Sequence, residues 1–507
     1  MDNYQQLITD LRRTFGTGKT RSLSWRRSQL EGIVKMVDEN RDEIVAAMKE
    51  DLSKPKSETI LMEVIQVRND AIQHLNNLDK WLEREKISKS IELIMDNVYI
   101  QRDPLGVVLI MGAWNYPFQL ALMPAVGAIA AGNCVVLKPS EVSPATAFVV
   151  EKLCRKYLDN DTFQIVQGGV TETTALLSER FDMIFYTGST SVGRIVATAA
   201  AKHLTPVILE LGGKSPCYVC PSSDLNISAR RIVWGRFCNT GQTCIAPDYI
   251  LCPSEIQPEL VRQLKKALVA FFGDDPQHCE SFGRIVNKRN FDRIKRLIDD
   301  APSDKIVVGG KTDVESRFIA PTIIQNATAD MLCMQEEIFG PVLPILTVKD
   351  EDAAIDFINS REKPLALYVF TKKSSIKEKF LNQTSSGSTC VNDTIMQAGI
   401  SGLPFGGVGE SGCGAYHGKF TLETFCHRKG VLEKKQGMEK LNDIRYPPYT
   451  DKKLKFLERL MAKGPSRRQF GLFLPIMLFS VIIGFILKVG WQIPPLNYIL
   501  KFISNKR

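Results

Sequence analysis

The first 85 residues carry hydrophobic side chains at a helical spacing. Leu30, Ile33 and Val37 recur three or four positions apart among many Glu, Lys and Arg residues. This spacing places the apolar side chains on one face of a helix. Residues 1–85 are therefore predicted to be helical. From Ile91 to Gln101 the pattern changes to that of a strand or hairpin, ending at the turn signal Asp103-Pro104.

Beyond Gly106, short and wholly apolar runs alternate with helical stretches. The runs predicted as strands are Gly106–Ile110, Cys134–Leu137, Phe163–Val166, Met183–Tyr186 and Val207–Leu209. Continuous apolar strands joined by helices are typical of a parallel sheet that is covered on both faces. In such sheets, ligands bind at the carboxyl ends of the strands.

A second α/β region is predicted from about Leu211 to Thr389. Its strand candidates are Tyr249–Leu251, Ile306–Val308 and Pro344–Val348. The Gly-rich stretch Gly399–Gly414 is too irregular for a helix or strand and is predicted to be an ordered loop. The fold class is therefore α/β with two sheet-containing regions.

Near its C-terminus the chain has 18 consecutive residues without a charge, FGLFLPIMLFSVIIGFIL, from Phe470 to Leu487. At a rise of about 1.5 Å per residue they would span roughly 27 Å, slightly less than a bilayer's hydrocarbon core. Lys488 can snorkel and Trp491 can lie at the interface. We predict that residues 470–489 span or insert deeply into a membrane. The alternatives are a buried core helix and an interfacial hairpin.

The segment before this stretch holds much of the chain's net charge of +9. Residues 431–468 contain eleven Lys/Arg and five Asp/Glu, a net of +6, and the rest of the chain is nearly balanced. A basic segment beside an apolar one is typical of contact with anionic lipid or of a solvated helix. Nucleic-acid binding is therefore not expected.

The twelve cysteines are scattered without the spacing of a disulfide framework, and residues 1–40 contain no apolar signal sequence. Free thiols in a reducing compartment are expected. Cys217 and Cys220 form a CxxC, but without a second pair or a nearby His no metal site is predicted. Cys244 lies in GQTCIAP, where a Gly and a Pro place it at the edge of regular structure. By itself, however, a cysteine is much more often a small core residue than a nucleophile.

Two other polar residues follow predicted strands. Glu210 comes directly after the apolar run 207–209, where burial should raise its pKa or require a partner. It is a candidate general base, with capping of the following glycine turn as the alternative. Asn115, in GAWNYP, offers a neutral amide that can stabilise an oxyanion. Its alternative is an Asx turn ahead of Pro117.

Three segments suggest nucleotide binding, although each also fits a surface loop. Lys138 and Glu141, in LKPSE, offer a cation and a carboxylate to ribose hydroxyls. A Gly-rich loop between a strand and a helix can bind a pyrophosphate through backbone N–H groups. Its residues are Gly188, Ser189, Thr190, Ser191, Val192 and Gly193. Glu337 and Phe339, in EEIFGP, supply a carboxylate and an aromatic ring before a turn.

Together these segments resemble the aldehyde dehydrogenase superfamily up to about residue 430. The ordered set WNYP, LKPSE, YTGSTSVG, LELGGKSP, GQTC, EEIFGPVLP and LPFGGVGESG carries the resemblance. The forms GQTCIAPDY and YHGKFTLETF look like the class 3 branch. The apolar tail looks like that of the membrane-anchored fatty aldehyde dehydrogenases within that branch.

The resemblance implies two doubly wound α/β domains and a small bridging element. Residues 1–85 and 104–209 would form a Rossmann-like NAD-binding domain, and residues 210–390 a catalytic domain. Residues 86–103 and 391–430 would form a bridging element that pairs the subunits of a homodimer. Residues 431–468 would be a basic juxtamembrane segment and 470–489 a C-terminal transmembrane anchor.

The resemblance also implies roles for the candidate residues. Cys244 would be the nucleophile, Glu210 the base and Asn115 the oxyanion donor. Lys138 and Glu141 would hold the adenosine ribose, residues 188–193 the pyrophosphate, and Glu337 with Phe339 the nicotinamide ribose. His417, in YHGK, would either line the substrate tunnel or be structural, so we leave it outside the catalytic set; Tyr116 would flank the nucleophile.

The expected reaction is NAD(P)-dependent oxidation of long-chain fatty aldehydes to fatty acids. NAD is the expected cofactor because Glu141 should disfavour a 2′-phosphate, but NADP is possible because relatives use both. No metal is expected. A CoA-acylating enzyme is an alternative that the water-activating Glu210 argues against, and a silent membrane scaffold is another. The catalytic part should be cytosolic and tail-anchored in the endoplasmic reticulum, with the peroxisome or mitochondrial outer membrane as alternatives.

Overall fold

The computed structural model describes residues 4–89, 93, 96–437 and 439–462. The chain divides into two compact units. The first comprises residues 1–87 and 99–431, and the second comprises residues 88–98 and 432–507. All of the candidate catalytic residues belong to the first unit.

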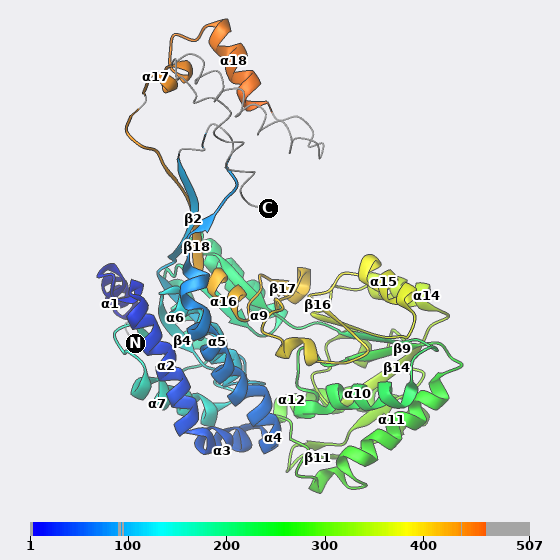
Figure 1. Cartoon of the computed structure of the whole chain (residues 1–507). Helices are drawn as coiled ribbons and strands as arrows, with labels where there is room; N and C mark the ends of the chain where they lie inside the picture. Colours follow the sequence, from blue (N-terminus) through cyan, green and yellow to red (C-terminus); the bar gives the residue numbers. More distant parts are fainter. Residues whose placement is uncertain (1–3, 90–92, 94–95, 438, 463–507) are drawn as a thin grey trace, which may run out of the picture. The chain divides into compact units, whose positions relative to one another are not determined.

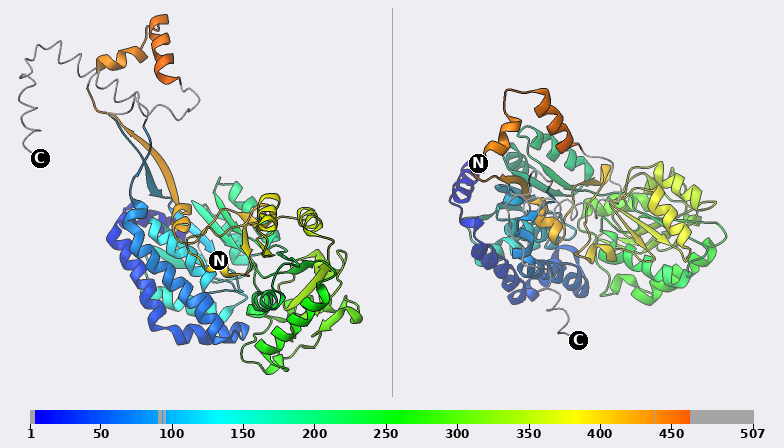
Figure 2. Two further views of the ribbon diagram at one scale, coloured as in Figure 1. Left: turned by 45° about the vertical axis from the view of Figure 1, so that its right-hand side comes forward. Right: turned by 45° about the horizontal axis from the view of Figure 1, so that its top comes forward.

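The N-terminal part of the first unit is helical, as its apolar spacing predicts. Its helices are α1 (Tyr4–Gly16), α2 (Leu23–Glu39), α3 (Arg41–Leu52), α4 (Lys56–Thr59) and α5 (Ile65–Leu82), with a π-helical turn at Ile60–Val64 between α4 and α5. Leu30, Ile33 and Val37 are buried on one face of α2. Figures 1 and 2 show these helices packed beside the first large sheet.

The first large sheet has six strands in the order β17-β7-β6-β3-β4-β5. Their bounds are β3 (Val107–Met111), β4 (Cys134–Lys138), β5 (Phe163–Ile165), β6 (Met183–Thr187), β7 (Val207–Glu210) and β17 (Gly412–Cys413). Strands β3 to β7 pair in parallel, whereas β17 pairs antiparallel with β7. The five apolar runs therefore form the predicted sheet.

Helices cover both faces of this sheet. They are α6 (Gln119–Ala131), α7 (Pro144–Tyr157), α8 (Val170–Ser178) and α9 (Thr190–Ala201). Residues of α2, α5, α6 and α7 pack with Val108 and Ile110, and residues of α1, α8 and α9 pack with Val107 and Leu109. Alternate residues of β3 thus face two apolar layers, which explains its continuous hydrophobic sequence.

The second large sheet has seven strands in the order β10-β13-β14-β9-β8-β15-β16. Their bounds are β8 (Pro216–Val219), β9 (Tyr249–Cys252), β10 (Ile306–Val308), β13 (Thr322–Ile324), β14 (Val342–Thr347), β15 (Ala366–Phe370) and β16 (Ser388–Val391). All neighbours pair in parallel except β10 with β13. A separate two-stranded sheet joins β11 (Thr312–Asp313) to β12 (Phe318–Ile319).

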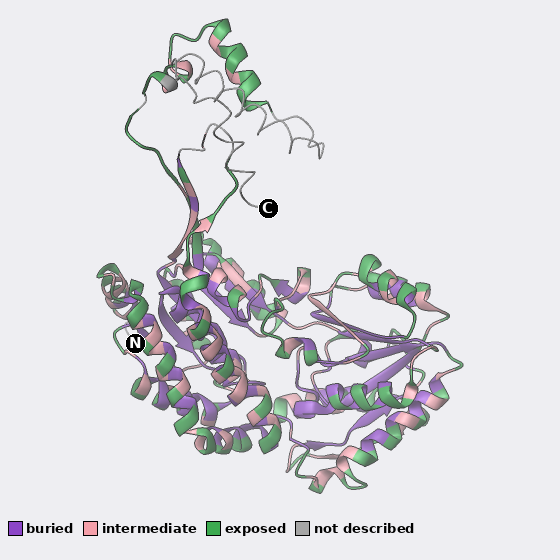
Figure 3. Ribbon diagram, viewed as in Figure 1, coloured by how far each residue is buried: buried purple, intermediate pink, exposed green. Residues whose placement is uncertain are grey.

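Helices also cover both faces of the second sheet. They are α10 (Leu225–Phe237), α11 (Gln257–Phe272), α12 (Lys288–Asp299), α13 (Leu332–Gln335), α14 (Glu351–Asn359) and α15 (Ser374–Gln383). The buried strand residues in Figure 3 are enclosed by helices whose outer faces are exposed. The fold class is α/β, with a doubly covered sheet in each region.

A smaller sheet joins the two segments that were predicted to bridge. It consists of β1 (Glu85–Lys86), β2 (Asn97–Pro104) and β18 (Cys426–Glu433) in the order β1-β2-β18. Helix α16 (Lys419–Thr424) precedes β18. The predicted turn at Asp103-Pro104 is wrong, because β2 continues through Pro104.

The prediction of a loop without regular elements over residues 399–414 is also wrong in part. Gly412 and Cys413 form β17 and pair with Glu210 and Leu209 of β7. Gly412 has φ 133°, and an added Cβ would lie 1.9 Å from the Leu209 carbonyl oxygen. The glycine therefore permits a close backbone approach at the sheet edge.

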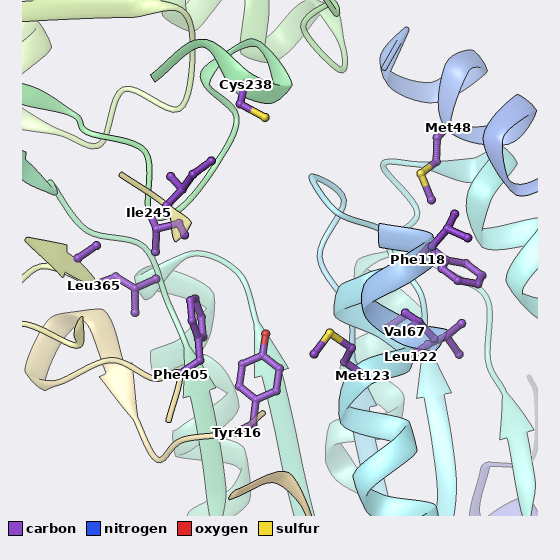
Figure 4. Close-up of a cluster of buried hydrophobic side chains, with 14 of the residues drawn as sticks. Met48, Val67, Phe118, Leu122, Met123, Cys238, Ile245, Leu365, Phe405 and Tyr416 are labelled. Atoms are coloured by element: carbon purple, nitrogen blue, oxygen red, sulfur yellow. The ribbon is translucent and has the colours of Figure 1, made fainter. Parts of the chain in front are cut away.

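The two α/β regions share one hydrophobic cluster. Figure 4 shows part of this cluster, with Phe118 and Leu122 from the first α/β region and Ile245 and Leu365 from the second. This shared core fixes the carboxyl ends of the first sheet next to the loop that carries Cys244.

The second unit contains α17 (Glu439–Asn442) and α18 (Asp451–Met461). Leu454, Phe456 and Met461 are exposed on α18. Within the described residues, no helix has the length and apolar character needed to cross a membrane. The predicted anchor, residues 470–489, and the last part of the basic segment 431–468 lie outside the described residues.

Candidate active site

A cavity of about 800 Å³ lies at the carboxyl ends of β3, β4, β6 and β7. It collects nearly all the residues that the sequence singles out. Its lining includes Cys244, Glu210, Asn115, Lys138, Glu141, Gly188, Ser189, Thr190, Ser191, Val192, Glu337 and Phe339. Gly193 does not line it. An added Cβ at Gly193 would lie 2.7 Å from Leu211 Cδ2, so this glycine allows α9 to pack closely.

The backbone before Cys244 is held in a strained conformation. Asn239, Thr240 and Gly241 have φ values of 49°, 56° and 74°. Gln242 stabilises this turn, because its Nε2 donates to the carbonyl oxygens of Asn239 at 3.1 Å and Arg284 at 3.0 Å. Strain of this kind persists only where the surroundings determine the conformation. The loop therefore presents Cys244 to the cavity at a fixed place.

The chain after Cys244 is fixed as well. The Tyr368 hydroxyl donates a hydrogen bond to the carbonyl oxygen of Ile245. Asp248 forms ion pairs through Oδ1 with Arg236 Nη1 at 2.8 Å and through Oδ2 with Lys214 Nζ at 2.6 Å. The side chains of Arg236 and Asp248 are only 1% and 3% exposed. Both sides of the cysteine are thus tied to the second α/β region.

Cys244 is a half-buried free thiol. Burial raises its pKa, and the nearby carboxylates of Glu337 and Glu210 raise it further. The thiolate is the reactive form of cysteine. Because its pKa is raised, the Cys244 thiol needs a nearby base that can remove its proton.

Glu210 ends β7 with its carboxylate buried. The residue is 3% exposed, and among the described residues neither carboxylate oxygen has a hydrogen-bond partner. Burial raises its pKa well above that of an exposed glutamate. The carboxylate does not cap the following glycine turn, which was the alternative. A buried carboxyl that has no partner among the described residues and a raised pKa is suited to accept a proton from a neighbouring group.

Asn115 connects the first sheet to the Cys244 loop. Its amide Nδ2 donates to the carbonyl oxygen of Gln242 at 3.1 Å. A carboxamide has two N–H groups, so this bond orients the amide and leaves a second donor for an oxyanion. Its neighbour Tyr116 makes a 2.7 Å hydrogen bond with the hydroxyl of Thr243, the residue before the nucleophile.

The nucleotide-binding candidates occupy the same cavity. Lys138 Nζ lies 2.9 Å from Glu141 Oε2, with Lys138 buried and Glu141 half exposed. Ser189 caps α9 by accepting a hydrogen bond from the Val192 N–H at 3.4 Å. A buried cation and a helix N-terminus at one cavity fit the phosphates and ribose of a dinucleotide.

Gly212 and Glu337 also line the cavity and lie against each other. An added Cβ at Gly212 would lie 2.0 Å from Glu337 Oε2, so only glycine leaves room for this carboxylate. Burial, together with the charge of Asp248, raises the pKa of Glu337 to about 8. The rings of Phe339 and Trp114 pack edge to face, with their centroids 5.2 Å apart.

The lining also includes polar residues that the sequence-based prediction missed, among them two on α12. Arg293 and Asn290 lie on α12 and face the cavity. Arg293 donates to the carbonyl oxygens of Glu337 at 3.2 Å and Ile338 at 2.6 Å, so it holds the segment that carries Glu337. In the sequence it is one of several basic residues on a helix whose pattern indicates a solvated face.

His417 is not among the residues that line the Cys244 cavity. It lines a separate polar cavity of about 440 Å³ together with residues of α5. Its ring stacks on Phe405 at 5.0 Å, and burial lowers its pKa to about 4. Cys217 and Cys220 are buried free thiols. Among the described residues, no group of His, Cys, Asp and Glu has an arrangement suited to a metal.

Comparisons with known proteins point to the same chemistry. Residues 2–431 match the aldehyde dehydrogenase family. Over 448 residues the chain is 50% identical to the dimeric NADP-preferring aldehyde dehydrogenase of Mus musculus, covering 88% of this chain and 98% of that protein. It is 46% identical over 484 residues to aldehyde dehydrogenase family 3 member A2 of Macaca fascicularis, covering 96% and 99%.

A solved structure is also similar to this chain over most of the chain's length. The substrate-bound state of Staphylococcus aureus AldH superposes with a TM-score of 0.89 at 38% identity. The match covers 91% of this chain and 100% of that one.

Proposed function

Because the chain belongs to the aldehyde dehydrogenase family and is an NAD(P)-dependent aldehyde dehydrogenase, we propose that it oxidises long-chain fatty aldehydes to fatty acids. In this proposal Cys244 is the nucleophile, Glu210 the general base and Asn115 the oxyanion donor. The observation that carries it is the convergence of these three side chains in one cavity with the dinucleotide-binding residues.

The first step is the formation and attack of the thiolate. Glu210, directly or through water, takes the proton of the Cys244 thiol, whose raised pKa otherwise keeps it neutral. The sulfur then adds to the aldehyde carbonyl carbon. The resulting oxyanion is held by the second N–H of Asn115 and by the backbone N–H of Cys244.

The second step is oxidation, followed by hydrolysis. NAD(P)⁺, when bound, supplies the hydride acceptor that this oxidation needs. Collapse of the thiohemiacetal leaves a thioester on Cys244 Sγ. Glu210 then accepts a proton from water as that water attacks the thioester, which releases the fatty acid and restores the thiol. The carboxylate of Glu210, which is buried and has no hydrogen-bond partner in the described part of the chain, suits both proton transfers.

The segments around the cavity have binding roles in this proposal. Lys138 and Glu141 hold the adenosine ribose, the loop of residues 188–193 the pyrophosphate, and Glu337 with Phe339 the nicotinamide ribose. The Glu141 carboxylate favours a ribose 2′-hydroxyl over a 2′-phosphate, so NAD is the preferred cofactor and NADP a weaker one.

The direct test of the nucleophile is Cys244→Ser, assayed for NADH formation with a C16 aldehyde. We expect turnover to be lost while dinucleotide binding persists. The matched control is Cys413→Ser, which replaces an exposed thiol and should keep normal turnover. Wild-type turnover in Cys244→Ser would contradict the assignment of Cys244 as the nucleophile.

The substrate proposal rests on the apolar tail and on similarity to family 3 relatives. Its test is a series of aldehydes from C4 to C18 with NAD and with NADP, measured for the full-length protein and for a version ending near Lys463. We expect kcat/KM to rise with chain length and to be higher with NAD. A preference for C4 would contradict the long-chain proposal, and acyl-CoA formation on adding CoA would replace hydrolysis by acyl transfer.

We also propose that residues 470–489 anchor the protein in a membrane, assisted by the basic segment 431–468. The support is the uncharged run of the sequence and the exposed apolar side chains Leu454, Phe456 and Met461 on the basic helix α18. The catalytic part would then be cytosolic, with the endoplasmic reticulum as the proposed membrane. The full-length protein should float with vesicles after alkaline extraction, and the version ending near Lys463 should not.

A homodimer is the proposed assembly, since a relative that covers most of this chain is named as dimeric. Light scattering of the version ending near Lys463 should give twice the chain mass. A monomer mass at micromolar concentration would contradict it.

A further inference from the structure

The segment between α3 and α5 contains a fully buried ion pair. Lys54 Nζ donates to Glu63 Oε1, and both side chains are 0% exposed. Glu63 lies in the π-helical turn Ile60–Val64. Single π-helical turns are frequent at functional sites. A buried ion pair is weak evidence of stabilisation, because apolar residues of the same volume often stabilise a core equally well.

Both members of the pair bind the loop that carries Asn115. Glu63 Oε2 accepts hydrogen bonds from the backbone N–H groups of Phe118 at 3.0 Å and Gln119 at 3.3 Å. Lys54 Nζ donates to the carbonyl oxygen of Asn115 at 3.0 Å. The same ammonium lies 4.0 Å from the centre of the Tyr116 ring.

The Asn115 carbonyl also connects to the Cys244 loop. It accepts a second hydrogen bond, at 2.8 Å, from Nδ2 of Asn239. Asn239 Nδ2 also donates at 3.0 Å to the Gln242 carbonyl, which is the oxygen that orients the Asn115 amide. The backbone N–H of Asn239 in turn donates to Glu58 of α4 at 2.9 Å.

The residues from Lys54 to Glu63 therefore contact both loops of the active site. They lie where the helical layer meets the second α/β region (Figure 1). The remaining hydrogen bonds of Lys54 and Glu63 go to the backbone of the loop that carries Asn115, so the pair fixes the position of this loop. Small displacements of a catalytic group have large effects on rate, and a misplacement of about 1 Å can cost about 100-fold.

We propose that Lys54 and Glu63 are positioning residues that fix the Asn115 amide relative to the sulfur of Cys244. They do not touch the aldehyde. They act by holding the backbone on both sides of Tyr116, so that the free N–H of Asn115 points to the place where the oxyanion forms. This inference rests on the proposed role of Asn115.

The test is a double-mutant cycle between Lys54→Met and Asn115→Ala. The Asn115→Ala variant keeps the backbone carbonyl that Lys54 binds but lacks the amide. We expect Lys54→Met alone to lower kcat by about 100-fold, as for a misplaced catalytic group. In the Asn115→Ala background the same substitution should change kcat by less than about twofold, because residues that act through one group are not additive.

Two further readouts separate positioning from general damage. In Lys54→Met, the dissociation constant for NADH and the rate of Cys244 alkylation by iodoacetamide should stay near their wild-type values. The matched control is Lys152→Met, which breaks an ion pair with Glu43 at the surface and should leave kcat unchanged. An equal loss of kcat in both backgrounds would overturn the inference.

A second variant covers the case in which Lys54→Met does not fold. In Lys54→Met/Glu63→Leu both charges are removed, so that no unpaired charge is buried. It should fold, bind NADH and still lose kcat only when Asn115 is present; wild-type kcat would overturn the inference. If Asn115→Ala itself has normal kcat, the proposed oxyanion role fails first, and this outcome is distinguishable from additivity.

Discussion

Replacing Glu210 with Gln tests the two proton transfers that the site requires. The substitution keeps the volume of the side chain but removes the only feature that lets it act as a base. The carboxylate is buried and has no hydrogen-bond partner among the described residues, so the amide breaks no existing contact. The effect on rate should therefore be chemical and not structural.

The expected magnitude follows from the role of the residue. A general base typically contributes about 10²- to 10⁴-fold, which corresponds to roughly 3–5 kcal/mol of transition-state stabilisation. Both proton transfers lose their base in this variant, but the small thiolate fraction of Cys244 is still a strong nucleophile, whereas water is a weak one and depends on the base to attack the thioester. Steady-state turnover should thus fall more than the first round of NADH formation.

The assay is stopped-flow absorbance of NADH with a C16 aldehyde and saturating NAD. We expect a burst that approaches one equivalent per active site, followed by slow turnover. Equal losses in the burst and in the steady state would show that Glu210 acts mainly before hydride transfer. Unchanged turnover would refute its role as a base.

The same variant has a pH-dependent effect on stability. Because burial raises the folded-state pKa of Glu210, the wild-type protein is most favoured when this carboxyl is protonated. That advantage is lost as pH rises through the folded-state pKa, and each unit of pKa shift corresponds to about 1.4 kcal/mol. Gln does not titrate. In urea titrations the stability of Glu210→Gln relative to wild type should increase from pH 5 to 9, and a constant difference would contradict the burial argument.

Three further substitutions test the scaffold of the site. Gly241→Ala places a Cβ 2.3 Å from a carbonyl oxygen at a φ of 74° and should lower the free energy of unfolding by about 1–3 kcal/mol in urea; an unchanged midpoint would contradict this. Arg236→Met removes a buried partner of Asp248 and should cost about 3–5 kcal/mol by the same assay, whereas a cost below about 1 kcal/mol would show that Lys214 suffices. Gly212→Ala displaces the Glu337 carboxylate and should raise the KM for NAD about tenfold, as expected for the loss of about 1.4 kcal/mol of binding, and an unaltered KM would argue against Glu337 as a ribose ligand.

The regular parts of the fold were predictable because their signal is local. The apolar runs at residues 134–137 and 183–186 are the strands β4 and β6, since strands buried on both faces must be apolar throughout. Strand β17 could not be predicted. Its two residues, Gly412 and Cys413, are a strand only because β7 offers an edge to pair with.

The candidate site shows the same division. Glu210 and Asn115 follow predicted strands, so topology alone brings them to one edge of the sheet. Lys54 and Glu63 gave no such signal, because they stand among many charged residues in a helical region. Their complete burial results from tertiary packing that only the folded structure shows.

The central claim is that the aldehyde carbon becomes covalently attached to Cys244. It is tested most directly by mass spectrometry of Glu210→Gln, quenched with acid within seconds of mixing with NAD and a C16 aldehyde. The account predicts a mass increase of one acyl group on the peptide that contains Cys244, in an amount that matches the NADH burst. An NADH burst with no acyl group on that peptide, or with the group on another cysteine, would contradict it.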